Sequence, residues 1–163
     1  MSNSQITIEY PEPLYSIFKT SRGDLPAIVV VNATLREFAH RDIFPWHLSV
    51  IIEPQELAER GMLTNEECTV VDAVGDEIEA AITGNRNGLF LARETSKGER
   101  ELSFRVHDPG IADNSLRQII ARGSQKREWE FLMKEDAGWT LAEPFFSLFL
   151  HAGGANADHV PRH

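Results

Sequence analysis

The sequence of 163 residues contains one cysteine, Cys68. No disulfide can form within the chain, and a zinc site built from thiolates alone is excluded. Long apolar runs are also missing, because the longest, at residues 145–150, is far shorter than the ~20 residues of a membrane-spanning helix. The first residues lack the basic and apolar segments of a secretory signal. We expect a cytoplasmic protein that makes no contact with a membrane.

Basic residues are scarce, with 16 against 25 acidic residues and a net charge of −9. The excess lies in residues 1–84, which hold 14 acidic and 5 basic residues, whereas residues 85–163 hold 11 of each. A duplex-binding domain needs a basic surface to neutralise phosphates, so nucleic acid is not an expected partner. The acidic half either attracts a basic protein surface or serves solubility alone.

Motifs of common catalytic sites are absent too. The sequence has no Gly-x-Ser-x-Gly elbow and no glycine-rich phosphate loop. We therefore predict no catalytic residue and no cofactor. The composition, 42% hydrophobic and 25% charged, is typical of one soluble globular domain. We expect an N-terminal arm at 1–13, a single domain at 14–150 and a disordered tail at 151–163.

Hydrophobic periodicity predicts the order of helices and strands. Expected strands lie at 14–20, 27–31, 46–53, 88–94, 100–107 and 128–134, and expected helices at 34–41, 64–84, about 113–123 and near Pro144. The best marked helix begins at Thr64, which fits a capping box with Glu67. Its apolar stripe consists of Val71, Val74, Ile78 and Ile82. Cys68 lies at the margin of this stripe, where we expect a partly buried, inert thiol.

The order strand, helix, strand, strand, helix, strand between residues 46 and 134 predicts an α+β fold with a ferredoxin-like βαββαβ unit. Right-handed crossovers then place the strand at 100–107 between those at 46–53 and 88–94 in an antiparallel sheet. Both helices are expected to cover one face of this sheet. An N-terminal β-hairpin and a C-terminal apolar helix are expected outside the unit.

The other face of the predicted sheet is polar. Pairing the two central strands along their full lengths would bring His47 near His107 and Ser49 near Arg105. RNA-binding versions of this fold carry aromatic residues at such positions, and none is present here, which argues against an RNA-recognition module. Two histidines could begin a metal site but a third ligand is missing, so we predict no metal.

The outer face of the helix at 64–84 is acidic and carries no base of its own. Its acids are Glu66, Asp72, Asp76, Glu77 and Glu79. Acids near the carboxyl end of a helix gain nothing from its dipole, so binding to a basic partner is one interpretation and plain solubility is the other. We take Asp72, Asp76 and Glu79 as candidate binding residues.

Several segments together resemble a known family. They are Asn32-Ala33-Thr34-Leu35, Phe44-Pro45-Trp46, Gly61-Met62-Leu63-Thr64-Asn65-Glu66-Glu67, Arg100-Glu101-Leu102-Ser103-Phe104, and Trp129-Glu130-Phe131 with Asp136 and Trp139. Their order and spacing resemble a bacterial domain-of-unknown-function family, number six hundred and ninety-five, over residues 14–149. Members are sometimes joined to a domain similar to RraB, the protein inhibitor of ribonuclease E. The resemblance thus implies an association with regulators of RNA degradation and supplies no catalytic residue.

Two hypotheses follow. The first is a non-enzymatic protein-interaction or regulatory module with an acidic helix face, of which an immunity-type inhibitor is a variant. The second is a small enzyme or ligand-binding protein that uses the polar sheet face, with His47, Arg105 and His107 as candidate residues. The partner of the first would be a protein with a basic surface. The sequence leaves the oligomeric state open.

Overall fold

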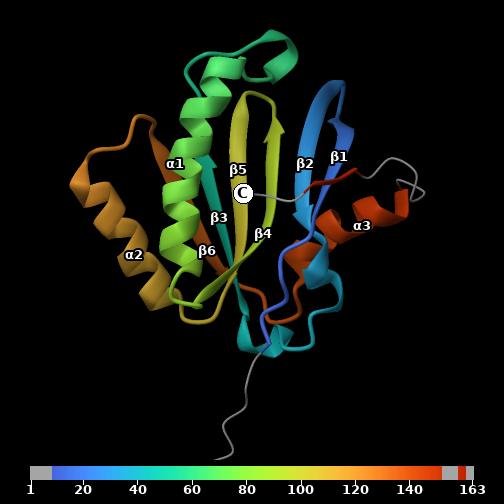
Figure 1. Ribbon diagram of the computed structural model, residues 1–163, viewed down its shortest axis with the longest axis vertical. Helices are drawn as coiled ribbons and strands as arrows, with labels where there is room; N and C mark the ends of the chain where they lie inside the picture. Colours follow the sequence, from blue (N-terminus) through green and yellow to red (C-terminus); the bar gives the residue numbers. More distant parts are fainter. Residues whose placement is uncertain (1–8, 152–157, 161–163) are drawn as a thin grey trace, which may run out of the picture.

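The computed structural model describes residues 9–151 and 158–160. In these residues seven strands form one sheet in the order β6-β3-β5-β4-β2-β1-β7, with antiparallel neighbours throughout (Figure 1). The strands are β1 (Tyr15–Arg22), β2 (Leu25–Asn32), β3 (Trp46–Ile52), β4 (Gly88–Ser96), β5 (Glu99–Val106), β6 (Trp129–Glu135) and β7 (Asp158–Val160). The α-helices are α1 (Asn65–Thr83), α2 (Pro109–Arg122) and α3 (Glu143–His151). Short 3-10 helices are η1 (Ala33–Glu37), η2 (Arg41–Ile43), η3 (Glu59–Gly61) and η4 (Thr140–Ala142).

Two hydrophobic cores lie on opposite faces of the sheet. On one face α1 and α2 lie side by side and cover the apolar side chains of the strands (Figure 1). The predicted inward residues are confirmed, since Leu48, Val50, Ile52, Leu102, Phe104, Val106 and the helical stripe including Ile78 are buried there, and Trp46, Trp129, Phe131 and Met133 pack against them. On the other face α3, η1 and η4 enclose a second core around Phe44 and Trp139.

The mixed α and β content, the antiparallel sheet and the strand neighbours agree with the prediction. β5 lies between β3 and β4, as expected. The hairpin of β1 and β2 does not stand apart from this unit, because β2 pairs with β4 and extends the same sheet. A helix follows Pro144 at the predicted place, as α3.

The start of α1 is half as predicted. The Thr64 side chain accepts a hydrogen bond from the Glu67 amide, at 3.1 Å. The Glu67 carboxylate does not complete the capping box; instead it accepts two bonds of 2.7 Å from Arg127 and one of 2.8 Å from the Gln55 amide. The hydrogen bonds from Arg127 are the largest cause that lowers the pKa of Glu67 to about 2. The carboxylate thereby fastens α1 to the segment that leads into β6.

Some of the sequence-based boundaries are wrong. The helix expected at 34–41 is replaced by the two short 3-10 helices η1 and η2. α2 begins at Pro109 and not near residue 113, because Asp108 accepts hydrogen bonds from the Gly110 and Ile111 amides and so caps the helix. Within the expected tail, Asp158–Val160 pair with β1 as β7. Residues 152–157 and 161–163 of that tail, and residues 1–8 of the arm, lie outside the described residues. None of the helices in the described part of the chain combines the length and apolar character needed to cross a membrane.

Candidate functional site

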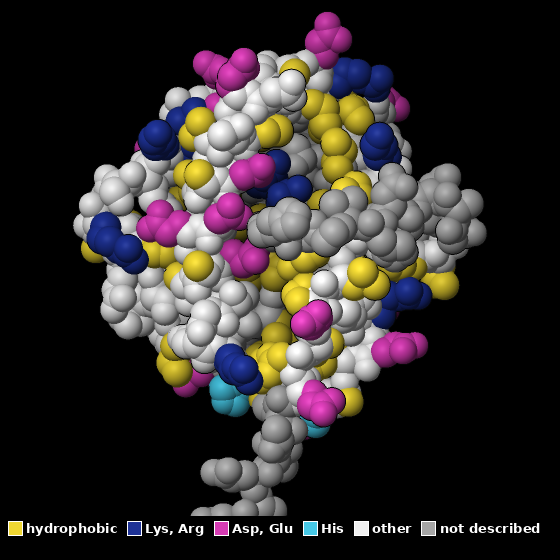
Figure 2. Space-filling model, viewed as in Figure 1, with side chains coloured by type: hydrophobic (Ala, Val, Ile, Leu, Met, Phe, Trp, Pro, Cys, Tyr) yellow, Lys and Arg dark blue, Asp and Glu magenta, His cyan; other side chains and the backbone are white. Residues whose placement is uncertain are grey.

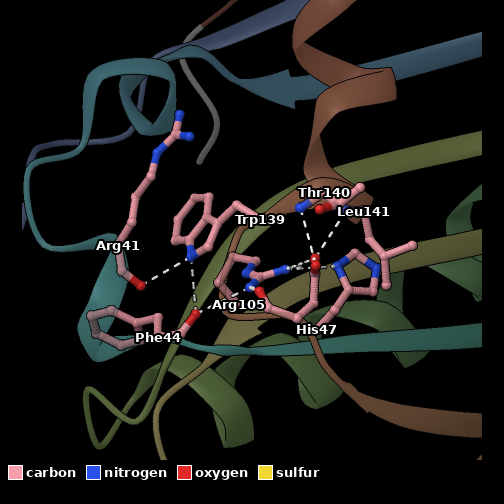
Figure 3. Close-up of polar contacts among 8 residues, drawn as sticks. Arg41, Phe44, His47, Arg105, Trp139, Thr140 and Leu141 are labelled. Atoms are coloured by element: carbon pink, nitrogen blue, oxygen red, sulfur yellow. Dashed lines mark hydrogen bonds and ion pairs between the residues drawn. The ribbon is translucent and has the colours of Figure 1, made fainter.

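Arg105 is the centre of the polar network on the face opposite α1 and α2. Its side chain is wholly buried. Nη1 donates to Oδ2 of Asp136 at 2.9 Å, and Nη2 donates to the backbone oxygens of Asp136, at 2.6 Å, and Phe44, at 3.2 Å (Figure 3). A buried guanidinium needs such acceptors because its desolvation is costly. Arg105 therefore ties β5 to the segments before β3 and after β6.

Trp139 covers this guanidinium from the side of η4. The Arg105 guanidinium carbon lies 4.6 Å from the centre of the indole ring, within the range of a cation–π contact. The indole Nε1 donates to the backbone oxygens of Arg41 and Phe44, each at 3.0 Å (Figure 3). Trp139 has a φ of 57°, a left-handed conformation uncommon for a large side chain, and the surrounding contacts hold it there.

Asp136 closes the turn that presents Trp139. Its carboxylate accepts hydrogen bonds from the backbone amides of Thr140, at 3.0 Å, and Leu141, at 2.9 Å. Burial acts to raise the pKa of Asp136. The bonds from these two amides and from Arg105 outweigh burial, so the pKa lies below its ordinary value and the group is ionised at neutral pH.

His47 lies directly opposite Arg105 on β3, and its Nδ1 is 3.4 Å from Nη1 of Arg105. Burial, followed by the positive charge of Arg105, lowers the pKa of His47 to about 4, although Asp136 acts in the other direction. The imidazole is therefore neutral at pH 7. With Nδ1 facing an obligate donor, the ring proton belongs on Nε2.

A cavity of about 400 Å³ opens beside His47 between the sheet and α3, and we call it the sheet-face pocket. Its polar floor comes from the strands: His47, Ser49, Ser103, Glu94 and Glu101. Its apolar wall is formed by Leu141, Pro144 and Phe145, and its rim by Arg22, Leu132 and Lys134. A largely apolar concavity with a few convergent polar groups is typical of a small-molecule site.

Part of the charge in the sheet-face pocket is already neutralised. Arg22 donates to both oxygens of Glu94, at 2.8 and 3.3 Å. The Ser49 hydroxyl donates a hydrogen bond to Glu101 at 2.7 Å. Because the hydroxyl is uncharged, it does not neutralise the Glu101 carboxylate. Lys134 takes part in none of the ion pairs formed among residues 9–151 and 158–160. The pocket therefore offers one carboxylate, Glu101, and one ammonium, Lys134, to a ligand.

The predicted approach of His47 to His107 is wrong. β3 and β5 pair two residues away from the expected register, so that His47 faces Arg105 and Ser49 faces Ser103. His107 follows the last residue of β5, and its Nδ1 lies 2.7 Å from the backbone oxygen of Ile43. A shift of two residues leaves every side chain on its original face, so the hydrophobic pattern could not exclude it. Within the described residues no three His, Cys, Asp or Glu side chains gather as a metal site would require.

The expectation that the acidic face of α1 lacks compensating bases is also wrong in part. Asp72 accepts a hydrogen bond of 2.6 Å from Arg100 and lies 3.7 Å from Arg93, and Glu77 lies 3.7 Å from Arg122. These arginines come from β5, β4 and α2, which sequence proximity does not reveal. Figure 2 shows acidic side chains gathered along α1, with basic ones in the hollow beside it.

The other two acidic candidates differ in their surroundings. Asp76 is exposed on α1. Glu79 lines a second cavity, of about 270 Å³, at the carboxyl end of the helix together with Tyr10 and Arg86. The Arg86 guanidinium carbon lies 4.9 Å from the centre of the Tyr10 ring. The structure thus does not bring Asp76 and Glu79 into the polar network around His47.

Most of the chain, including Asp136, Trp139 and the Phe44 segment, lies within a match to one known protein family. A model of the family described as "family of unknown function (DUF695)" matches residues 15–147. The chain belongs to the DUF695 family. No curated protein and no solved structure matches it. The resemblance segments at 44–46, 136 and 139 are the parts of this DUF695 chain that meet around Arg105.

Proposed function

We propose that this DUF695 protein is a binding module whose sheet-face pocket takes a small zwitterion with an apolar body, such as a free apolar amino acid. The observation that carries the proposal is the combination, in one cavity, of the Glu101 carboxylate, the Lys134 ammonium and the apolar wall at Leu141, Pro144 and Phe145.

Each group of such a ligand has a chemical counterpart in the pocket. Its amine would pair with Glu101 and its carboxylate with Lys134, as charge-assisted hydrogen bonds. Its side chain would lie against Pro144 and Phe145 of α3. A neutral His47 contributes an Nε2–H donor without adding a second positive charge.

Binding is favoured over catalysis because the most reactive side chain of the pocket has a structural task. The Nδ1 lone pair of His47 faces Arg105, and the low pKa of His47 removes it from general acid–base work near pH 7. The hydroxyl of Ser49 is held by Glu101. These contacts support a non-enzymatic role. Of the two forms of the second hypothesis, a small enzyme or a ligand-binding protein, they favour the ligand-binding protein.

The test is calorimetric titration with leucine, with isocaproate, which lacks the amine, and with isoamylamine, which lacks the carboxylate. Glu101→Gln and Lys134→Gln should each weaken leucine binding by at least about tenfold, as expected for a lost charged contact. Only Lys134→Gln should affect isocaproate. Lys126→Gln, an exposed lysine outside the pocket, is the matched control. A leucine affinity that neither pocket variant changes would contradict the proposal.

The acidic face of α1 supports a second candidate function, the protein-interaction or regulatory module. The exposed positions of Glu66 and Asp76 favour a partner with a basic surface and disfavour nucleic acid and anionic membranes. An immunity-type role and an association with regulators of RNA degradation are variants of this proposal. The single cysteine supports the cytoplasm as the proposed compartment, and the family resemblance supports a bacterium as the proposed source.

A lysine-rich peptide tests this second candidate. Asp76→Lys combined with Glu79→Lys should slow its association and flatten the dependence of the rate on salt. Asp113→Lys combined with Glu128→Lys, both outside α1, is the control, since it changes the net charge by the same amount. Equal rates and salt slopes for the parent and the α1 variant would reject the acidic face as a binding surface.

We also propose that β3, α1, β4, β5, α2 and β6 form a ferredoxin-like unit, to which β2, β1 and β7 were added at one edge. The order β6-β3-β5-β4 and the position of both helices over one face support this grouping. The sheet-face pocket then lies on the face that α1 and α2 leave uncovered, where α3 and η4 supply the outer wall.

A further inference from the structure

β6 is the last strand at one end of the sheet. It pairs with β3 on one side, and no strand among residues 9–151 and 158–160 pairs with its other side. Its solvent-facing residues on the pocket face are Glu130, Leu132 and Lys134, and Leu132 is 69% exposed. An open edge with exposed backbone donors and acceptors is a template for pairing with another strand.

We infer that β6 pairs antiparallel with β6 of a second copy of this chain, so that two sheets join into one across a two-fold axis. β6 runs from Trp129 to Glu135, and its midpoint is Leu132. Two copies that overlap over the full strand must therefore place Leu132 opposite Leu132. The same register places Glu130 of each copy opposite Lys134 of the other.

This self-pairing is complementary over the central residues 130–134, whereas at the strand ends it places Trp129 opposite Glu135. On the pocket face it forms two oppositely charged pairs around a central leucine contact, and such pairs stabilise antiparallel strands. On the helix face it places Phe131 opposite Met133, both half-buried against the core formed with α1 and α2. A two-fold axis normal to the sheet keeps both helix layers on one face, as an isologous interface requires.

The charges of β6 favour a second copy over an unrelated strand. Charged residues on an edge strand usually prevent pairing, and a partner without the matching charges would leave Glu130 and Lys134 facing nothing of opposite sign. Lys134 also lies at the rim of the sheet-face pocket. An ammonium has three donors, so the pairing with Glu130 is compatible with a ligand but does not depend on one.

Charge reversal and its rescue test the register. We expect analytical ultracentrifugation of the full chain to show a monomer–dimer equilibrium. Lys134→Glu should raise the dissociation constant of the dimer at least about tenfold. In each of the two symmetric pairs, Glu130 of one copy would then face an acid at position 134 of the other. Adding Glu130→Lys should return the constant to within about threefold of the parent value. Circular dichroism confirms that each variant is folded. A parent chain that stays monomeric at several hundred micromolar overturns the inference, as does a double variant as weak as the single one.

Cross-linking provides a second test that is independent of the pocket. In a Cys68→Ser background, Leu132→Cys should form an intermolecular disulfide on mild oxidation, because the two thiols would face each other at the axis. Glu130→Cys is the matched control, since it is exposed on the same face but lies opposite residue 134. Equal cross-linking of the two variants would contradict the register. If leucine did not bind, the results expected from ultracentrifugation and cross-linking would stay the same. The failure of the proposed pocket function can therefore be distinguished from the failure of the dimer.

Discussion

Arg105 and Asp136 form a buried ion pair of 2.9 Å that joins the middle of the sheet to the turn after β6. Neither residue is exposed enough for solvent to replace its partner, because their side chains are 0% and 9% exposed. Asp136 also accepts a hydrogen bond from the amide of Leu141 in the pocket wall, and Arg105 lies opposite His47 in the pocket floor, where its charge adds to burial in lowering the pKa of His47. The wall and the floor of the sheet-face pocket therefore depend on one contact.

Removing Asp136 should destabilise the protein severely. Asp136→Ala leaves the Arg105 charge buried without its carboxylate and frees the amides of Thr140 and Leu141. Breaking a buried pair in this way costs ~3–5 kcal/mol of unfolding free energy. Urea unfolding at pH 7 measures the loss, and Asp113→Ala, in an exposed pair with Arg117, should cost less than ~1 kcal/mol. Similar losses for the two variants would contradict a structural role for the buried pair.

His47 should make stability depend on pH in the range from 6.5 to 4. Its pKa is about 4 in the folded chain and ordinarily 6.5, so in this window the unfolded chain binds a proton that the folded chain does not. The contribution of the neutral His47 to the free energy of unfolding is complete above pH 6.5. It is lost as the pH falls towards 4, and the loss amounts to about 3 kcal/mol. Urea midpoints of His47→Gln should fall less steeply over this range than those of the parent. The exposed His151→Gln serves as control and should follow the parent.

Glu67 should produce a second loss of stability at lower pH. Its pKa is depressed to about 2 from an ordinary 4.5, so its contribution is present above pH 4.5 and is lost as the pH falls towards 2. Glu67→Gln should lower the urea midpoint at pH 7. It should also reduce the fall of the urea midpoint between pH 4.5 and pH 2.5. Glu66→Gln, on an exposed position of the same helical turn, should change neither. A parent-like acid transition in Glu67→Gln would show that the bonds to Arg127 do not govern it.

Ile78 should be a strong determinant of the core under α1. It is fully buried at the centre of the helical stripe, so Ile78→Ala leaves a cavity and should cost ~2–5 kcal/mol. Ile120→Ala, on the half-exposed side of α2, should cost much less. Chemical denaturation of both variants compares them directly. An unchanged midpoint for Ile78→Ala is incompatible with this packing.

The sequence alone was sufficient to predict which side chains face the helices. Leu48, Leu102 and Phe104 alternate with polar residues along their strands, and the direction of a side chain on a strand follows from its position along the chain. The beginning and facing of α1 followed for the same reason, from Thr64 and the spacing around Ile78. These features are local, so a short stretch of sequence contains their cause.

Only the tertiary structure decided the register, the partners of the charges and the cover over the polar face. His47 faces Arg105 and not His107 because a shift of two residues preserves every facing, and long-range packing selects among such shifts. Arg100 reaches Asp72, and Asp136 reaches Arg105, across 28 and 31 residues of chain. Side chains so far apart in sequence meet only after the chain has folded, because their contact depends on how whole elements pack and not on any local pattern.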